Sequence, residues 1–215
     1  MATILVYNND TNKIEKYNKG LSETMPYATQ NTLTVREFRG SSNSNLMWTT
    51  KYFMEDWNEL RKLWGKPIKV GYAFKRIWQA GHAGMSQHYA GLAMDIAQNL
   101  SNTERDNLRN LAIDSRLFTY VEPKVLTPTW VHIDSRMGTP ACPTGGYPLI
   151  KQGSRGVYVM VLQDALNYLG YSVGNIDGIF GSKTKNAVVR YQRENSLSRD
   201  GIVGCSTWKS ITQKV

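Results

Sequence analysis

Apolar residues recur at helical spacing in the first half of the chain. Four large side chains, at intervals of four, three and four, fall on one face of a helix predicted over about 48–64. They are Phe53, Trp57, Leu60 and Trp64. Gly65 stands where a C-cap glycine would, and Pro67 prevents continuation. A second helix is predicted after Ser101, because Ser101 and Glu104 form a capping box. We interpret the aromatic stripe as core packing.

Short apolar or alternating runs predict strands around these helices. Four such runs follow the first helix, and the last two are joined by a proline-containing loop. They cover 68–72, 92–97, 117–121 and 130–133. At the N-terminus, we predict one strand at Ile4–Tyr7 and a loop for the rest of residues 1–33. The pattern therefore predicts an α+β domain over residues 1–138, with its core at about 34–136.

Glycine and proline become dense between Met137 and Pro148, and we predict a linker over 139–148. Beyond it, a short pattern occurs twice, with an Asp-Gly turn followed by a second Gly and then a Thr. The copies are Asp177–Gly181 with Thr184, and Asp200–Gly204 with Thr207. We interpret each as a helix entry, in which glycine allows a tight backbone and the hydroxyl caps. This predicts a small helical bundle over residues 149–215.

The composition indicates a globular protein with an acidic partner. The 215 residues are 41% hydrophobic and 20% charged, with a formal net charge of +9. A basic surface suits nucleic acid, anionic lipid or a polyanionic cell wall. The Lys and Arg residues are dispersed, whereas nucleic-acid arms carry dense basic blocks, so we do not expect nucleic-acid binding.

The first residues lack a charged region followed by a long apolar run, and the sequence has no stretch of 18 apolar residues. We therefore expect no secretory signal, no membrane insertion, and synthesis in the cytoplasm. The two cysteines are Cys142 and Cys205, and their sequence positions leave open whether they pair. Neither has the Cys-x-x-Cys spacing of a metal or redox site, and neither is predicted to be catalytic.

The candidate chemistry lies in two segments. His88 and Asp95 are seven residues apart, and His132 follows 37 residues after Asp95. Residues seven apart on a continuous strand point to opposite faces, so His88 and Asp95 converge only if the backbone turns between them. Gly91 allows that turn, which places His88 on a loop and Asp95 on the following strand. A His and an Asp at this spacing are often purely structural, but two His and one Asp can also form a catalytic zinc site.

Resemblance to a known family favours the zinc site. The pattern Ser-x-His-x6-Asp at Ser86, His88 and Asp95, with a later His in a short strand, resembles the paired motifs of the M15 family of zinc peptidases. The later strand reads Trp130-Val131-His132-Ile133-Asp134. The family includes D-alanyl-D-alanine carboxypeptidases and phage peptidoglycan endopeptidases. The resemblance implies that His88, Asp95 and His132 bind Zn²⁺ and that the domain hydrolyses an amide bond.

The general base and the oxyanion donor depart from the family pattern. Many members place an acidic residue or a His two or three positions before the last zinc ligand, where this chain has Trp130 and Thr129. Two carboxylates remain as alternative bases, namely Asp134 and Glu122, and Asp134 is alternatively a group that orients a ligand. Members often carry an Arg directly after a Gly-Tyr pair. Here Ala73 takes that position, and the candidate oxyanion donor is Arg76. We interpret His82 as a loop residue.

The segment from Leu149 to Ile211 resembles the peptidoglycan-binding domain of the three-helix type. The matching residues include Gly153–Gly156, Asp177–Gly181, Asp200–Gly204 and Thr207-Trp208. The resemblance implies an all-α three-helix bundle that binds the bacterial cell wall.

Taken together, we expect an α+β zinc peptidase domain with a small antiparallel sheet, followed by the wall-binding bundle. The expected function is that of a monomeric, endolysin-like endopeptidase that cuts stem or cross-link peptides of bacterial peptidoglycan. It would reach the wall by phage-mediated release. The alternatives are a D-alanyl-D-alanine carboxypeptidase and a wall-binding protein with weak or no catalysis.

Overall fold

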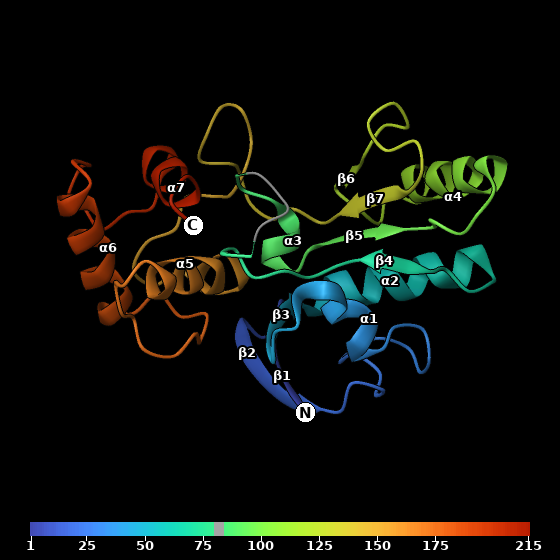
Figure 1. The fold of residues 1–215 in the computed structure, drawn as a ribbon, viewed down its shortest axis with the longest axis horizontal. Helices are drawn as coiled ribbons and strands as arrows, with labels where there is room; N and C mark the ends of the chain where they lie inside the picture. Colours follow the sequence, from blue (N-terminus) through green and yellow to red (C-terminus); the bar gives the residue numbers. More distant parts are fainter. Residues whose placement is uncertain (80–83) are drawn as a thin grey trace.

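The computed structural model describes residues 1–79 and 84–215, and its fold is α+β, as the sequence predicts. Two small sheets with their helices occupy one side of the molecule, and the three C-terminal helices lie at the other end (Figure 1). We use the boundaries predicted from the sequence and call residues 1–138 the N-terminal part and residues 149–215 the C-terminal bundle. Within the described ranges, no helix combines the length and apolar character needed to cross a membrane.

The first sheet is formed by strands near the N-terminus. β1 (Ala2–Asn8) pairs antiparallel with β2 (Lys13–Lys19) and parallel with β3 (Leu46–Thr50), which gives the order β2-β1-β3. The prediction of loop after Tyr7 is wrong for β2. This edge strand consists mainly of Lys, Glu and Asn and has no buried residue, so its sequence lacks the apolar alternation of a half-buried strand.

The long helix α2 (Lys51–Trp64) begins later than predicted, because Trp48 to Thr50 belong to β3. The Thr50 side chain accepts a hydrogen bond from the Phe53 N–H and caps the helix. Gly65 ends it in the left-handed conformation, with φ of 71°, as predicted. Three members of the stripe are fully buried, which confirms its interpretation as core packing. They are Phe53, Trp57 and Leu60.

The second sheet has the order β4-β5-β7-β6, with antiparallel neighbours throughout. Its strands overlap the four predicted runs. They are β4 (Val70–Tyr72), β5 (Ala93–Ile96), β6 (Tyr120–Val121) and β7 (Val131–Asp134). Two helical segments lie beside β4, namely α1 (Val35–Arg39) and the 3-10 turn η1 (Gly40–Ser42). The helix α4 (Asn102–Asp114) begins at the predicted Ser101–Glu104 capping box and packs against β6, β7 and α2.

The C-terminal bundle is built on a repeated buried glutamine. Its helices are α5 (Val157–Tyr168), α6 (Ser182–Glu194) and α7 (Cys205–Thr212). The amide nitrogen of Gln163 donates to Asp177 Oδ1 at 2.8 Å and to Thr184 Oγ1 at 3.2 Å. Gln192 makes the same bonds to Asp200 and Thr207, at 2.9 and 3.3 Å. The two Asp-Gly turns do lead into helices, but the threonine hydroxyls accept from glutamine and cap neither helix.

A buried ion pair joins the bundle to the N-terminal part. Asp164 on α5 is 2% exposed and accepts from Arg76 Nε at 2.7 Å and from Trp78 Nε1 at 3.1 Å. The Arg76 guanidinium also lies over the Trp48 ring, and the Trp78 ring stacks on Tyr168. This contact removes Asp164 and most of the Arg76 side chain from water, so each charge stabilises the fold only while the other is present.

Substitution of Asp164 by alanine is therefore expected to lower the free energy of unfolding by about 3 kcal/mol, because it leaves the largely covered Arg76 guanidinium without its partner. Denaturant titration of the full chain measures this effect. The matched control is Asp106→Ala, which removes an exposed pair with Lys124 and should cost less than about 1 kcal/mol. Equal losses in the two variants would contradict a stabilising role for the buried pair.

The segment predicted as a linker, 139–148, is packed and crosslinked. Cys142 forms a disulfide with Cys205, the first residue of α7, which settles the pairing that the sequence left open. Tyr147 is fully buried, and its ring contacts Tyr158 of α5 and Trp208 of α7. The Tyr147 hydroxyl also bonds to the Ser86 carbonyl oxygen, so the segment contacts both the bundle and the N-terminal part.

Candidate metal centre

The helical turn α3 (Gln87–Ala90) positions His88. The Ser86 side chain accepts from the His88 N–H at its start, and Gly91 ends it with φ of 67°. A Cβ on Gly91 would lie 1.9 Å from the Trp48 carbonyl oxygen, so glycine is required there by both conformation and space. The turn predicted at Gly91 is confirmed, whereas His88 lies on a one-turn helix and not on a loop.

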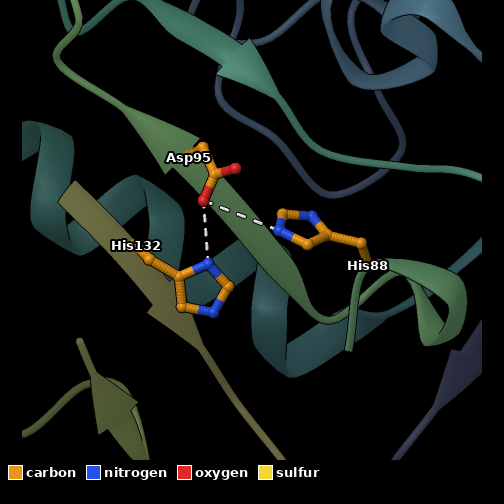
Figure 2. A group of neighbouring side chains, drawn as sticks. All are labelled: His88, Asp95 and His132. Atoms are coloured by element: carbon orange, nitrogen blue, oxygen red, sulfur yellow. Dashed lines mark hydrogen bonds and ion pairs between the residues drawn. The ribbon is translucent and has the colours of Figure 1, made fainter. Parts of the chain in front are cut away.

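The other two side chains come from neighbouring strands. Asp95 on β5 and His132 on β7 are directly opposite each other in the antiparallel register, so both side chains lie on the same face of the sheet. Asp95 Oδ1 is 2.8 Å from His132 Nδ1 and 3.6 Å from His88 Nε2. Figure 2 shows the carboxylate between the two rings. One ligand atom from each residue lies within 4.8 Å of the others, and we call this group the His–Asp–His cluster.

Each imidazole has its second nitrogen occupied by an acceptor. His88 Nδ1 is 2.7 Å from the Ala73 carbonyl oxygen, and His132 Nε2 is 3.3 Å from Asp134 Oδ2. Such partners hold metal-binding histidines in the tautomer that turns a lone pair to the metal. The nitrogens facing Asp95 are thus His88 Nε2 and His132 Nδ1. This donor set of two imidazoles and one carboxylate fits a catalytic zinc ion.

Asp134 is fully buried and is held by Arg136. The Arg136 Nε and Nη2 atoms donate to the two carboxylate oxygens at 2.8 and 2.6 Å. Both oxygens are therefore engaged, and one of them also faces His132 Nε2. Such geometry suits an orienting carboxylate better than a group that must reach a water molecule.

Buried charges shift the ionisation of these residues. Burial alone would raise the pKa of Asp95, but hydrogen bonds from His132 and His88 and the charges on both rings hold that pKa well below its usual value. Burial opposes the charge on His132 too, while hydrogen bonds to Asp134 and Asp95 raise its pKa to about 9. The Arg136 guanidinium and His132 outweigh burial and lower the pKa of Asp134. Two ionised carboxylates, Asp95 and Asp134, therefore lie against the imidazoles of the site.

A pocket of about 310 Å³ opens onto the cluster. Both candidate bases, Glu122 and Asp134, line it together with Arg136. Glu122 follows β6, and its backbone N–H bonds to the His132 carbonyl oxygen, which brings it beside the cluster. Gly146 and Met85 complete one side of the pocket, so the segment 139–148 contributes to its wall.

The structure does not bring Arg76 to this pocket. Its guanidinium pairs with Asp164 and stacks over tryptophan rings in the interface with α5. The arginine at the pocket is Arg136, which the sequence reasoning missed. Its position two residues after Asp134, and four after His132 on the same chain segment, was the available signal. His82 lies outside the described residues.

Comparison with known proteins identifies the C-terminal bundle. Residues 155–211 match the PG_binding_1 family, a peptidoglycan binding domain. N-acetylmuramoyl-L-alanine amidase CwlM of Mycobacterium tuberculosis is 47% identical over 53 residues, which cover 25% of this chain and 13% of that protein. The spore cortex-lytic enzyme of Oceanobacillus iheyensis is 40% identical over 65 residues, which cover 30% of this chain and 24% of that enzyme.

Among solved structures, a peptidoglycan-binding protein from Clostridioides difficile in complex with glutamine hydroxamate is 48% identical. The match covers 30% of this chain and 40% of that chain, with a TM-score of 0.29. The chain spans less than a quarter of the length of the two curated relatives. The matches to the amidase and to the spore cortex-lytic enzyme cover only the binding domain.

Proposed function

Residues 155–211 are a peptidoglycan-binding domain, and from that premise we propose that the chain is a zinc-dependent peptidoglycan peptidase. In this proposal it is an endolysin-like endopeptidase that cuts stem or cross-link peptides of the bacterial wall. The observation that carries the proposal is the His–Asp–His cluster beside a polar pocket. A wall-binding domain on the same chain supports peptidoglycan as the substrate, because it raises the local concentration of the site at an insoluble polymer.

The residues that would hold the metal are His88, Asp95 and His132, through Nε2, Oδ1 and Nδ1. A zinc ion supplies Lewis acidity there, which polarises a carbonyl oxygen and makes water a stronger nucleophile at neutral pH. Three protein ligands leave room for substrate and water, as in catalytic zinc sites. The Ala73 carbonyl and Asp134 orient the two imidazoles toward that position.

We assign the general base to Glu122. Both alternatives line the pocket, but the Asp134 carboxylate is committed to Arg136 and His132. Glu122 accepts the proton of the attacking water on its carboxylate and returns it to the leaving amine. Arg136 borders the same pocket and uses Nε and Nη2 on Asp134, so its Nη1 is the guanidinium nitrogen available to a substrate carbonyl or carboxylate.

The test is digestion of purified peptidoglycan by the full chain with zinc present, followed by mass spectrometry of the released products. An endopeptidase produces new peptide termini within stems or cross-links and solubilises the wall. Release of D-alanine alone would replace this proposal by the carboxypeptidase alternative. A chain that binds the wall but neither retains zinc nor releases peptides would instead be a binding protein.

A further inference from the structure

The turn that carries His88 is held on one side by the C-terminal bundle. In Figure 1, α3 lies between β5 and the N-terminal end of α5, and it contacts both elements. The Tyr158 hydroxyl on α5 donates to Gln87 Oε1 at 3.0 Å and accepts from the Met137 N–H at 3.0 Å. Tyr158 and Gln87 are 5% and 6% exposed, so solvent offers little replacement for this bond.

A second tyrosine holds the start of the same turn. The Tyr147 hydroxyl donates to the Ser86 carbonyl oxygen at 2.5 Å. The Tyr147 ring is fixed between Tyr158 and Trp208, at centroid distances of 5.1 and 5.0 Å. Ser86 and Gln87, directly before His88, thus depend on side chains from outside the N-terminal part.

These contacts matter because α3 has only four residues. A helix of this length has no stability of its own and takes its position from what packs around it. On one side, His88 Nδ1 is held by the Ala73 carbonyl oxygen. On the other, the Gln87 side chain is held by Tyr158 of the bundle, and the Ser86 backbone is held by Tyr147 of the segment 139–148. A flexibly tethered wall-binding domain would need none of these buried bonds, nor the pair between Arg76 and Asp164.

We propose that the C-terminal bundle, together with the segment 139–148 that packs against it, is a positioning element of the metal site. Tyr158, acting through Gln87, and Tyr147, acting through Ser86, hold α3 so that His88 Nε2 faces Asp95 and His132. The metal-binding consequence rests on the proposed function, whereas the ordering of α3 does not. Substrate binding to the bundle and metal binding at the cluster then share one rigid unit.

The experiment compares Tyr158→Phe with Tyr168→Phe in the full chain. Both change a tyrosine of α5 by one hydroxyl, but Tyr168 is 56% exposed and its ring contact with Trp78 is retained. In metal-free protein, hydrogen exchange at residues 86–91 is expected to be about fivefold faster in Tyr158→Phe, because the buried hydrogen bond to Gln87 is lost. The zinc dissociation constant, measured by chelator competition, is expected to rise about 10-fold. Tyr168→Phe leaves both quantities unchanged.

The two readouts separate this inference from the proposed function. Unchanged exchange at residues 86–91 in Tyr158→Phe overturns the positioning role. Faster exchange with an unchanged zinc dissociation constant also overturns it as a role in the metal site. If the wild-type chain binds no zinc while exchange rises in Tyr158→Phe, the ordering of α3 by the bundle is upheld and the zinc peptidase proposal fails.

Discussion

Replacement of His88 by alanine is expected to abolish stoichiometric zinc binding and peptidoglycan hydrolysis together. The substitution removes Nε2 from the cluster and leaves Asp95 and His132, whereas catalytic zinc sites use three protein ligands. Elemental analysis of desalted protein should fall from about one zinc per chain to near zero. Release of soluble peptides from purified wall, measured in parallel, should disappear with the metal.

The matched control is Asp106→Ala. It removes an exposed carboxylate that belongs neither to the cluster nor to the pocket lining, so all three ligands stay in place. It should retain zinc and hydrolysis. Circular dichroism of His88→Ala checks that the fold survives, as expected when one side chain at a pocket is truncated. A folded His88→Ala variant that still carries one zinc per chain would contradict the assignment of the cluster.

Replacement of Glu122 by glutamine is expected to lower the turnover number by about 10²–10⁴-fold without loss of zinc. Glutamine keeps the size of the side chain but cannot accept a proton from water. Because Glu122 lines the pocket and is not a member of the cluster, the metal content should be that of the wild type. Steady-state hydrolysis of a defined stem peptide, with zinc quantified in the same samples, measures both quantities.

Asp134→Asn provides the contrasting outcome. It weakens the acceptor for His132 Nε2 and leaves Arg136 without its carboxylate partner, so the zinc dissociation constant should rise about 10- to 100-fold. Turnover at saturating zinc should be affected less than in Glu122→Gln. The reverse pattern, with full turnover in Glu122→Gln and a severe loss in metal-saturated Asp134→Asn, would transfer the role of base to Asp134.

Local patterns in the sequence correctly predict many of the helices, strands and turns. The stripe on α2, the capping box at Ser101 and the turn at Gly91 each depend on residues within a few positions, and such preferences act in any context. The edge strand β2 lacked such a signal because its residues are polar and none is buried. The predicted start of α2 is too early because Trp48 pairs with Leu5 of β1, a partner distant in the sequence.

From the sequence alone, resemblance to two families pointed to the three cluster residues and to a wall-binding bundle over 149–215, within which residues 155–211 match the peptidoglycan binding family. Only the tertiary structure decided which arginine reaches the pocket, which nitrogen of each imidazole faces Asp95, and how the two candidate carboxylates differ. These outcomes depend on the register of β5 against β7 and on the packing of α5 against α3, where Tyr158 and Gln87 are 71 residues apart. Sequence motifs identify candidate residues. The direction of each side chain is set by neighbours that only folding brings together.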